Sequence, residues 1–397
     1  MTNLIFDLNN IAHRSLFIVG GFGSKAFTFD SQDEIDQLMR KMATDIAQII
    51  RTINSSRIIF ALDSKSWRKD IVIDENQGYK GQRIKSSSIN WKNVYSALDE
   101  LSEIMESKGM IVTKIEKAEA DDVMALWAQE LQFVQNQHVI IVSGDEDMRQ
   151  LVRGYPYDIT QNKWAFTTVY NPFMQGKNAS KKLFVSDNFE TWLNTAAPVD
   201  FMNMRASIDV DREDFNKIIT GERTKIEHIN GRMIGMRKLF CGDDGDNVPA
   251  IHTWLNDKGV EVRVTNSKFE KIYEMLLTSP NELMDHYDLI ARSEKVATAI
   301  RKVIKQDLPF DIDDRLDRQI KLVILDTQFF PASIRDKFRE LKDEQLAKPN
   351  ANRGSINMYN LLEGTRYVDV NRKPNAPNRS EAGIFKEIDR IKSNSLF

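Results

Sequence analysis

Residues 138–147, HVIIVSGDED, provide the starting point for interpreting the rest of the sequence. The uninterrupted apolar run at 139–142 is bounded by a Ser-Gly pair, which predicts a fully buried β-strand. Asp145 and Asp147 follow directly. Because ligands of parallel α/β sheets bind beyond the carboxyl ends of the strands, this stretch predicts a charged site at a sheet edge.

The same pattern recurs along the chain. Asp7 ends one apolar segment, Asp63 ends RIIFALD (57–63), and a third acidic group follows MIVTKI (110–115). A further acidic group lies in CGDDGDN (241–247). The candidate carboxylates are Asp7, Asp63, Glu119, Asp121, Asp122, Asp145, Asp147, Asp243 and Asp246. Carboxylates held close together repel, and a hard divalent cation is the usual remedy.

The ligand types favour magnesium or manganese. The chain has five scattered histidines and one cysteine, Cys241, so no His/Cys pattern predicts zinc. An all-oxygen site suits Mg²⁺ or Mn²⁺. For any single acidic group, a helix cap remains the alternative, because Asp and Glu also favour helix N-termini.

Hydrophobic periodicity predicts an α/β fold. Helical spacing at 32–54, 91–107 and 120–133 alternates with strands at 3–8, 57–63, 110–115 and 138–144, which predicts a parallel sheet. Residues 156–173 suggest a hairpin. Further on, helices are expected at 226–241, 267–277, 281–291, 293–306 and 332–346, with an apolar segment at 321–331.

Bulk composition limits the class of protein. The 397 residues are 41% hydrophobic, which supports a sizeable core, and contain no run long enough to cross a membrane. We expect no signal peptide, and the single cysteine predicts a reducing cytoplasm. The net charge of −3 argues against nucleic acid, but residues 65–85 hold six basic and three acidic side chains. This basic stretch predicts phosphate contact beside the acidic site, with a solvated loop as the alternative.

Six motifs carry a family resemblance: IFDLNN (5–10), ALDSKSWRKD (61–70), YKGQR (79–83), KAEADDVMA (117–125), VIIVSGDEDMRQL (139–151) and CGDDGDNVP (241–249). In this order they resemble the flap endonuclease / 5′-nuclease family, closest to the ribonuclease H (5′→3′ exonuclease) of T-even phages. The resemblance implies a PIN-like parallel sheet with flanking helices and a helical arch. It also implies a mainly helical C-terminal region with a helix–three-turn–helix-like module.

The resemblance assigns a role to each motif residue. One Mg²⁺ would be held by Asp7, Asp63, Glu119, Asp121, Asp145 and Asp147, and a second, looser one by Asp122, Asp243 and Asp246; Mn²⁺ would substitute. Lys80, Arg83 and Asp145 would be catalytic, with Lys80 and Arg83 gripping the scissile phosphate. The implied nucleic-acid contacts are Arg14, Arg68, Tyr79, Lys80, Arg83, Arg237 and Lys238. For Arg14 an ordinary surface arginine is the alternative.

The expected domains follow from the same comparison. Residues 1–154 would form the nuclease core with the arch at about 64–90, and 155–215 an insertion. Residues 216–345 would form the helical DNA-binding region, and 346–397 an extension with a flexible tail from about 366. The family often has a Gly-rich hairpin after the GDDGDNVP motif, whereas residues 250–259, AIHTWLNDKG, contain little glycine.

The implied function is structure-specific 5′ nuclease activity on RNA primers and DNA during phage replication, in the infected host cytoplasm. We expect a monomer that binds DNA and RNA–DNA duplexes with 5′ ends or flaps, and no membrane. The segment at 383–397 is compatible with docking to a sliding clamp or single-strand-binding protein. The alternative function is a non-catalytic DNA-junction-binding or clamp-recruited scaffold. A PIN-type RNA endonuclease is disfavoured because those domains are short and lack the arch.

Overall fold

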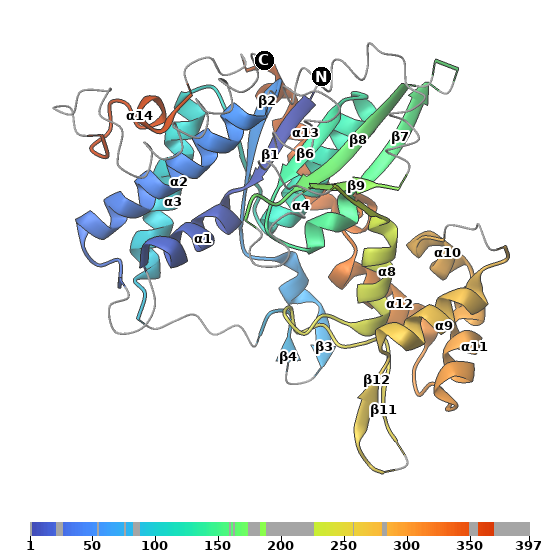
Figure 1. Cartoon of the computed structure of the whole chain (residues 1–397). Coiled ribbons are helices and arrows are strands. Elements are labelled where there is room, and N and C mark those ends of the chain that lie inside the picture. Colours follow the sequence, from blue (N-terminus) through green and yellow to red (C-terminus); the bar gives the residue numbers. More distant parts are fainter. Residues whose placement is uncertain are drawn as a thin grey trace, which may run out of the picture.

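The computed structural model describes most of the chain. The described residues are 2–20, 27–53, 55–74, 77–81, 88–158, 160–161, 163–173, 183–187, 226–256, 258–279, 284–348 and 356–368. Figure 1 shows a sheet flanked by helices, with a second, mainly helical region below it. In these residues no helix is both long enough and apolar enough to span a bilayer.

Four parallel strands form the centre of the sheet: β1 (Thr2–Asp7), β2 (Arg57–Leu62), β5 (Ile111–Lys114) and β6 (His138–Val142). They lie in the order β6-β1-β2-β5. All four predicted strands are confirmed, with small shifts at their ends. The carboxyl ends of β6, β1 and β2 therefore meet at one edge of the sheet.

Helices cover both faces of the sheet. On one face lie α1 (Leu8–Gly20), α2 (Gln32–Thr52) and α3 (Trp91–Ser107), and on the other α4 (Ala120–Gln129) and α13 (Ala332–Ala347). Along β1, Leu4 and Phe6 face the first layer and Ile5 the second. This is why the strand is a continuous apolar run: both of its faces are buried.

The sheet continues past residue 154. The predicted hairpin is formed by β7 (Arg153–Asp158) and β8 (Lys163–Tyr170), and β8 runs parallel to β6. β9 (Leu183–Ser186) and β10 (Ile226–Ile229) extend the sheet further. Part of the stretch expected as an insertion, 155–215, is thus built into the core sheet; residues 188–215 lie outside the described ones.

One expected helix begins later than its periodicity predicts. Residues 226–229 form β10 rather than the first turn of a helix at 226–241. The helix α8 (Gly231–Cys241) starts after Asn230, whose side-chain oxygen accepts a hydrogen bond from the Met233 backbone N–H. This N-cap, together with pairing of β10 to β9, fixes the boundary.

The C-terminal region has its own apolar core. It contains α8, α9 (Asn266–Leu276), α10 (His286–Ala291), α11 (Ser293–Ile304) and α12 (Ile312–Val323), followed by a 3-10 turn at Thr327–Phe329. The helices expected at 267–277, 293–306 and 332–346 are present, with small shifts at their ends. Of the helix expected at 281–291, residues 286–291 are helical, 284–285 are not, and 281–283 lie outside the described residues. The apolar segment 321–331 is the end of α12 and the turn after it.

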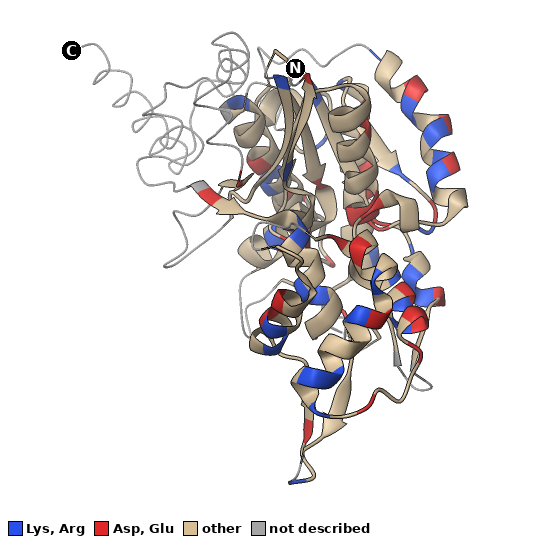
Figure 2. Cartoon of the chain, turned by 90° about the vertical axis from the view of Figure 1, so that its right-hand side faces the viewer, with Lys and Arg blue, Asp and Glu red and all other residues tan. Residues whose placement is uncertain are grey.

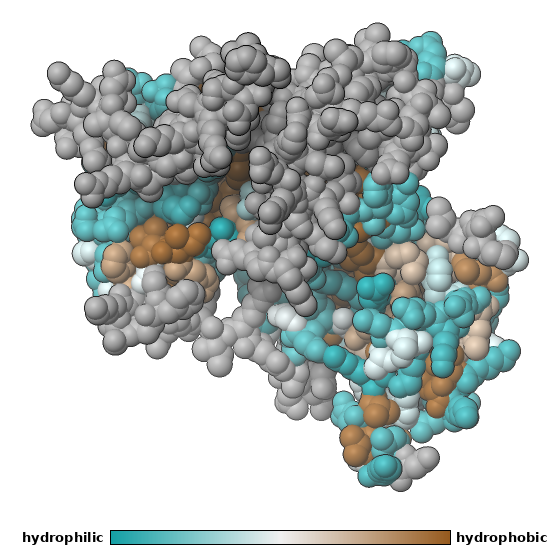
Figure 3. Space-filling model, in the orientation of Figure 1, coloured by the Kyte–Doolittle hydropathy of each residue, from teal (hydrophilic) through white to brown (hydrophobic). Residues whose placement is uncertain are grey.

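A projecting hairpin separates α8 from α9. It consists of β11 (Thr253–Leu255) and β12 (Glu261–Arg263), in the stretch that contains little glycine. Figure 3 shows apolar surface near its end, where Leu255 and Val260 are more than half exposed. The hairpin is the part of the helical region farthest from the sheet (Figure 1).

The described part of 64–90 differs from the expected helical arch. It forms a 3-10 turn (Trp67–Asp70) and a small hairpin of β3 (Val72–Asp74) and β4 (Gln77–Gly78). Residues 75–76 and 82–87 lie outside the described ones. No long helix forms in the described residues of this stretch, because Trp67 and Arg68 are buried against the start of α4 instead of standing free.

The C-terminal extension is packed as far as residue 368. α14 (Met358–Leu361) lies on α2, and Tyr367 is buried. The Tyr367 hydroxyl donates to Glu100 Oε2 at 2.5 Å, and Arg40 donates to the Tyr367 carbonyl. The expected start of the tail at about 366 therefore falls too early; residues 369–397 lie outside the described ones.

Candidate active site

The strand-end carboxylates meet at one edge of the sheet. Asp7 ends β1 and is buried; its oxygens accept from the Asn10 backbone N–H at 2.8 Å and the Ser143 hydroxyl at 3.0 Å. Asp63 follows β2 and accepts from the backbone N–H of Ala120, the first residue of α4, at 2.8 Å. These bonds fix Asp7 between α1 and the loop after β6, and Asp63 against the start of α4.

Burial and repulsion between neighbouring carboxylates raise the pKa of two residues in this group. Burial raises the pKa of Asp7 to about 7, with further contributions from the charges of Asp63 and Asp145. Burial also raises the pKa of Asp121, and Asp145 and Asp7 add to it. A clustered set of oxygen ligands whose charges disfavour one another fits a divalent cation of the Mg²⁺ or Mn²⁺ type.

A second carboxylate group lies beside the first. One oxygen from each of Asp147, Asp243 and Asp246 falls within 4.8 Å of the others. Lys238 binds two of them: its Nζ lies 2.5 Å from Asp243 Oδ2 and also contacts Asp147. The structure thus groups Asp147 with the GDDGDN residues, although the resemblance placed it in the tighter site with Asp145.

Glycine fixes the shape of the GDDGDN loop. Gly242 has φ of 78°, and a Cβ there would lie 2.5 Å from the Val248 carbonyl oxygen, so only glycine fits. Asp243 and Val248 exchange two backbone hydrogen bonds of 2.8 Å, which close the loop. The loop therefore presents Asp243 and Asp246 to the sheet edge from the helical region.

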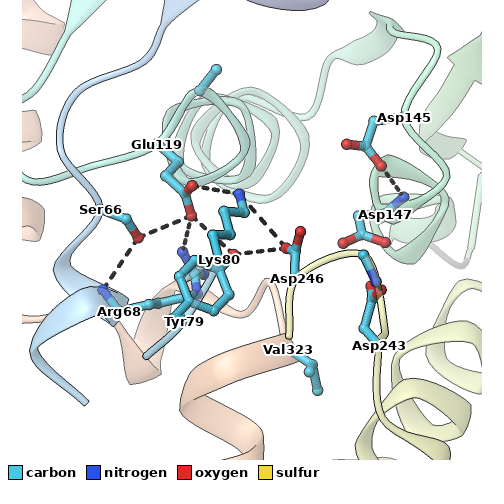
Figure 4. A network of polar contacts seen from close by, with 12 residues as sticks. Ser66, Arg68, Tyr79, Lys80, Glu119, Asp145, Asp147, Asp243, Asp246 and Val323 are labelled. Atoms are coloured by element: carbon cyan, nitrogen blue, oxygen red, sulfur yellow. Dashed lines mark hydrogen bonds and ion pairs between the residues drawn. The ribbon is translucent and has the colours of Figure 1, made fainter. Parts of the chain in front are cut away.

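Asp246 joins the two halves of the site, as Figure 4 shows. The Tyr79 hydroxyl lies 2.9 Å from Asp246 Oδ2 and 3.1 Å from Glu119 Oε2, so its one proton is shared between the two carboxylates. Lys80 Nζ lies 2.5 Å from Glu119 Oε1 and 3.6 Å from Asp246 Oδ2. Burial opposes the charged form of Glu119, but Lys80 and Arg68 outweigh it and lower its pKa. Lys80 thus already stands as a cation between the carboxylate groups.

Tyr79, which the resemblance implies as a nucleic-acid contact that stacks on the terminal base, is buried in this structure. Its side chain is 5% exposed and belongs to the apolar cluster of the helical region, with Ile73 and Phe240. In this conformation the ring packs against protein and the hydroxyl ties Glu119 to Asp246. In this structure Tyr79 holds the two halves of the site together.

Arg68 and Asp122 form a buried ion pair, instead of facing a phosphate and a metal ion respectively. Both are at most 2% exposed, and the Arg68 guanidinium donates to both Asp122 oxygens, at 2.7 and 3.0 Å. Trp67 Nε1 adds a bond of 3.1 Å to Asp122. The structure therefore places Arg68 away from a phosphate and leaves Asp122 little free capacity for a metal. We propose that this pair positions Glu119, to which Arg68 also donates at 3.3 Å.

Loss of that pair should destabilise the fold. We predict that Arg68→Met lowers the free energy of unfolding by about 3–5 kcal/mol, because it leaves the Asp122 charge buried without its partner. Urea denaturation with Mg²⁺ absent measures this. Lys114→Met is the matched control, since Lys114 pairs with Asp99 at an exposed site. A loss for Arg68→Met as small as the control's would contradict the pairing.

The remaining predicted nucleic-acid contacts are spread around the site. Arg14 Nη1 donates to the Phe173 carbonyl at 3.1 Å, and the guanidinium lies 4.1 Å from the centre of the Phe173 ring, so this arginine is already engaged. Arg237 is exposed on α8, and Lys238 is bound to the carboxylates. Arg83 lies outside the described residues.

Sequence reasoning missed a set of residues that orient the strand ends. Asn9 Oδ1 accepts from the Asp63 backbone N–H at 3.0 Å, and Asn10 Oδ1 accepts from the Gly144 backbone N–H at 3.0 Å. The Ser66 hydroxyl donates to Glu119 Oε2 at 3.0 Å. The two asparagines, in the first turn of α1, tie the end of β1 to the loops after β2 and β6. Their position two and three residues after Asp7 in IFDLNN was the available signal.

The raised pKa of Asp7 leads to a pH-dependent prediction. Its folded pKa of about 7 exceeds the ordinary 3.8, so the folded state binds more protons and loses stability as pH rises between these values. In EDTA, Asp7→Asn should therefore match wild type near pH 4 and be more stable at pH 7.5, by on the order of 1–3 kcal/mol.

Melting curves at the two pH values, with Asp99→Asn as the exposed control, measure this effect. Mg²⁺ should stabilise wild type more than Asp7→Asn, because the ion relieves the repulsion that the amide has already removed. Equal stability of the two proteins in EDTA at pH 7.5 would mean that Asp7 is not under electrostatic strain.

The comparisons with known proteins agree with this architecture. Residues 2–181 match the family model described as "5′-3′ exonuclease, N-terminal resolvase-like domain". No curated protein matches the sequence.

Among solved structures, the bacteriophage T5 D15 protein crystallised with metal ions is 15% identical. That comparison covers 87% of this chain and 98% of the T5 protein, with a TM-score of 0.41. A complex of the T5 D15 flap endonuclease with DNA and metal ions is 15% identical, and the T5 5′-exonuclease with bound zinc is 16% identical. Each covers 87% of this chain and 99% of the other, with a TM-score of 0.42. Likenesses this distant carry no argument of their own.

The α/β part of the molecule gathers acidic side chains at its strand ends. Residues 2–181, a little under half of the chain, match the N-terminal domain of the 5′-3′ exonuclease family. This match indicates a metal-dependent nuclease.

Proposed function

We propose that the chain is a structure-specific 5′ nuclease that uses two Mg²⁺ ions, with Mn²⁺ able to substitute, to remove RNA primers and DNA flaps in phage replication. The observation that supports it best is the double carboxylate group. The charges of Asp7, Asp63, Asp121 and Asp145 act on one another. Asp147, Asp243 and Asp246 each place one oxygen within 4.8 Å of the other two. Glu119 interacts with Asp63 of the first group and is linked to Asp246 of the second through Tyr79 and Lys80.

The ions would supply two things when bound: activation of a water molecule and neutralisation of the leaving oxygen. The chain's own residues would position the strand. Lys80 contacts Glu119 and lies near Asp246, so it stands where a phosphate bridging the two groups would need a cation. Arg83, three residues on, would share that phosphate. Both would stabilise charge that develops in the transition state.

Lys238 would exchange partners during this process. It neutralises Asp147 and Asp243 in the present arrangement. Ion binding to those carboxylates would free its ammonium for the phosphate backbone, together with the exposed Arg237 one residue before it. Figure 2 shows basic and acidic residues interspersed over the helical region. Lys238 and Arg237 would therefore act as separate phosphate contacts, not as part of a continuous basic surface. Such backbone contacts would position the duplex without reading its sequence.

The substrates would be DNA and RNA–DNA duplexes with 5′ ends or flaps. We propose that the chain acts as a monomer in the cytoplasm of an infected bacterial cell. Its C-terminal segment at 383–397 would be the place for a sliding clamp or single-strand-binding protein to dock. The alternative, a junction-binding scaffold without catalysis, is disfavoured because all nine carboxylates of the motifs are present.

Substrate choice can be tested directly. Time courses would compare a labelled 5′-flap DNA, an RNA-primed DNA duplex and a blunt duplex of unrelated sequence, all with Mg²⁺. Faster cleavage of the first two, independent of sequence, is expected. Equal cleavage of the blunt duplex, or strong sequence dependence, would contradict structure-specific action at 5′ ends.

A further inference from the structure

A cavity lies apart from the carboxylate groups. It has a volume of about 310 Å³, at the lower end of the range for small-molecule sites. Its lining residues belong to α4, the turn after α4, residues 150–151, the start of β7, α8, α10 and residues 324–328. None of the nine candidate carboxylates is among the described residues that line it. The cavity therefore needs an explanation separate from the metal site.

One wall of this cavity carries a cation, Arg153. The half-buried Arg153 guanidinium lies 5.2 Å from the centre of the Phe133 ring. Among the described residues it has no ion-pair partner. Burial lowers the pKa of Arg153, and the charge of Asp326 partly opposes this, with smaller contributions from Tyr287 and Asp285. An anion that entered the cavity and paired directly with the guanidinium would offset the cost of its partial burial.

The acidic residues of the cavity are engaged by donors of its own walls. Asp326 accepts from the Tyr287 hydroxyl at 2.9 Å and from the Gln328 backbone N–H at 3.0 Å, and it lies 3.2 Å from His286 Nε2. Asp285 caps α10 through two backbone N–H groups. Arg232, at the rim, is more than half exposed and lies 3.9 Å from Asp285. With these carboxylates already paired, the guanidinium groups of Arg153 and Arg232 are the charged donors facing a ligand, which favours an anion.

Aromatic rings line the space beside these donors. Phe133 lies under Arg153, and His286 and Tyr287 form the α10 wall, with their ring centres 4.3 Å apart. Aromatic side chains stack with nucleobases largely irrespective of base identity. An anion next to aromatic walls, in a cavity of this size, fits a nucleotide better than a bare phosphate.

We propose that this cavity binds a nucleoside 5′-monophosphate, with its phosphate on Arg153 and its base against the His286 and Tyr287 rings. The nucleotide is either a free product or the terminal nucleotide of a strand. Only the origin of the nucleotide rests on the proposed function; the binding site does not. A nucleotide bound in the cavity would lie between β7 of the nuclease core and α8, the helix that also carries Lys238.

Calorimetric titration of the full chain with dAMP in EDTA tests the site without any cleavage. Binding of dAMP is expected, with deoxyadenosine and inorganic phosphate each at least about tenfold weaker, because each lacks one of the two recognised groups. Arg153→Gln should weaken dAMP binding at least about tenfold, and Arg153→Lys less. Arg149→Gln is the matched control, since Arg149 also lies over a phenylalanine ring, that of Phe184, but outside the cavity.

Three results would overturn the site: no binding of dAMP, equal binding by folded Arg153→Gln, or equal binding of inorganic phosphate. Competition by a 5′-phosphorylated tetranucleotide would assign the site to strand ends, and its failure to compete would assign it to free product. Asp145→Asn should bind dAMP like wild type, which separates this site from the nuclease centre.

Discussion

Asp145→Asn is expected to abolish cleavage while leaving the affinity for a 5′-flap duplex within about twofold of wild type. Asp145 contributes to raising the pKa of both Asp7 and Asp121, so its charge lies within the first carboxylate group. An amide cannot replace that charge toward a cation. Since bound ions supply several kcal/mol of transition-state stabilisation, the single-turnover rate should fall by roughly a thousandfold or more.

The substitution should be structurally mild. Asp145 Oδ1 accepts from the Asp147 backbone N–H at 2.8 Å, and the carbonyl oxygen of asparagine can keep that bond. Glu146→Gln is the matched control: Glu146 is exposed and pairs with Arg149 at 3.0 Å, away from the site. The control should cleave normally. Normal turnover by Asp145→Asn would remove Asp145 from the metal site.

Lys80→Ala should slow the chemical step by about a hundredfold to a thousandfold, with a much smaller change in duplex affinity. Those factors are typical for loss of one preorganised charge that acts on the transition state. Lys80 is held by Glu119 and by the Asp246 backbone carbonyl, which accepts from the Lys80 N–H at 2.8 Å. Its ammonium is therefore preorganised between the two carboxylate groups.

Single-turnover rates and duplex dissociation constants measured on the same preparation separate the two roles of Lys80. Lys114→Ala, at an exposed ion pair, is the control. Lys80→Arg should recover part of the rate because the charge is kept. A loss of affinity without loss of rate would make Lys80 a simple phosphate clamp.

The strand-end part of the site could be predicted from sequence because its determinants are local. Asp7, Asp63 and Asp145 each follow a short apolar run, and parallel topology brings the ends of such strands together without further information. The same reasoning found the sheet and most of the helices.

Other features depended on contacts that no local pattern contains. Arg68 stands in a basic stretch typical of a solvated or phosphate-binding loop, yet it is buried because Asp122, more than fifty residues away, accepts two of its hydrogen bonds. The position of Lys238 between Asp147 and Asp243 likewise arises from the packing of α8 against the nuclease core. Residues 226–229 have apolar spacing compatible with a helix, and only pairing with β9 makes them a strand.

The central claim is that these carboxylates serve metal-dependent hydrolysis from a 5′ end. The most direct measurement is a time course on a 5′-flap duplex labelled at its 5′ end, with Mg²⁺ and with EDTA. Short labelled products that appear with Mg²⁺ and are absent with EDTA are predicted. Tight binding without products in Mg²⁺, or cleavage that persists in EDTA, would contradict the account.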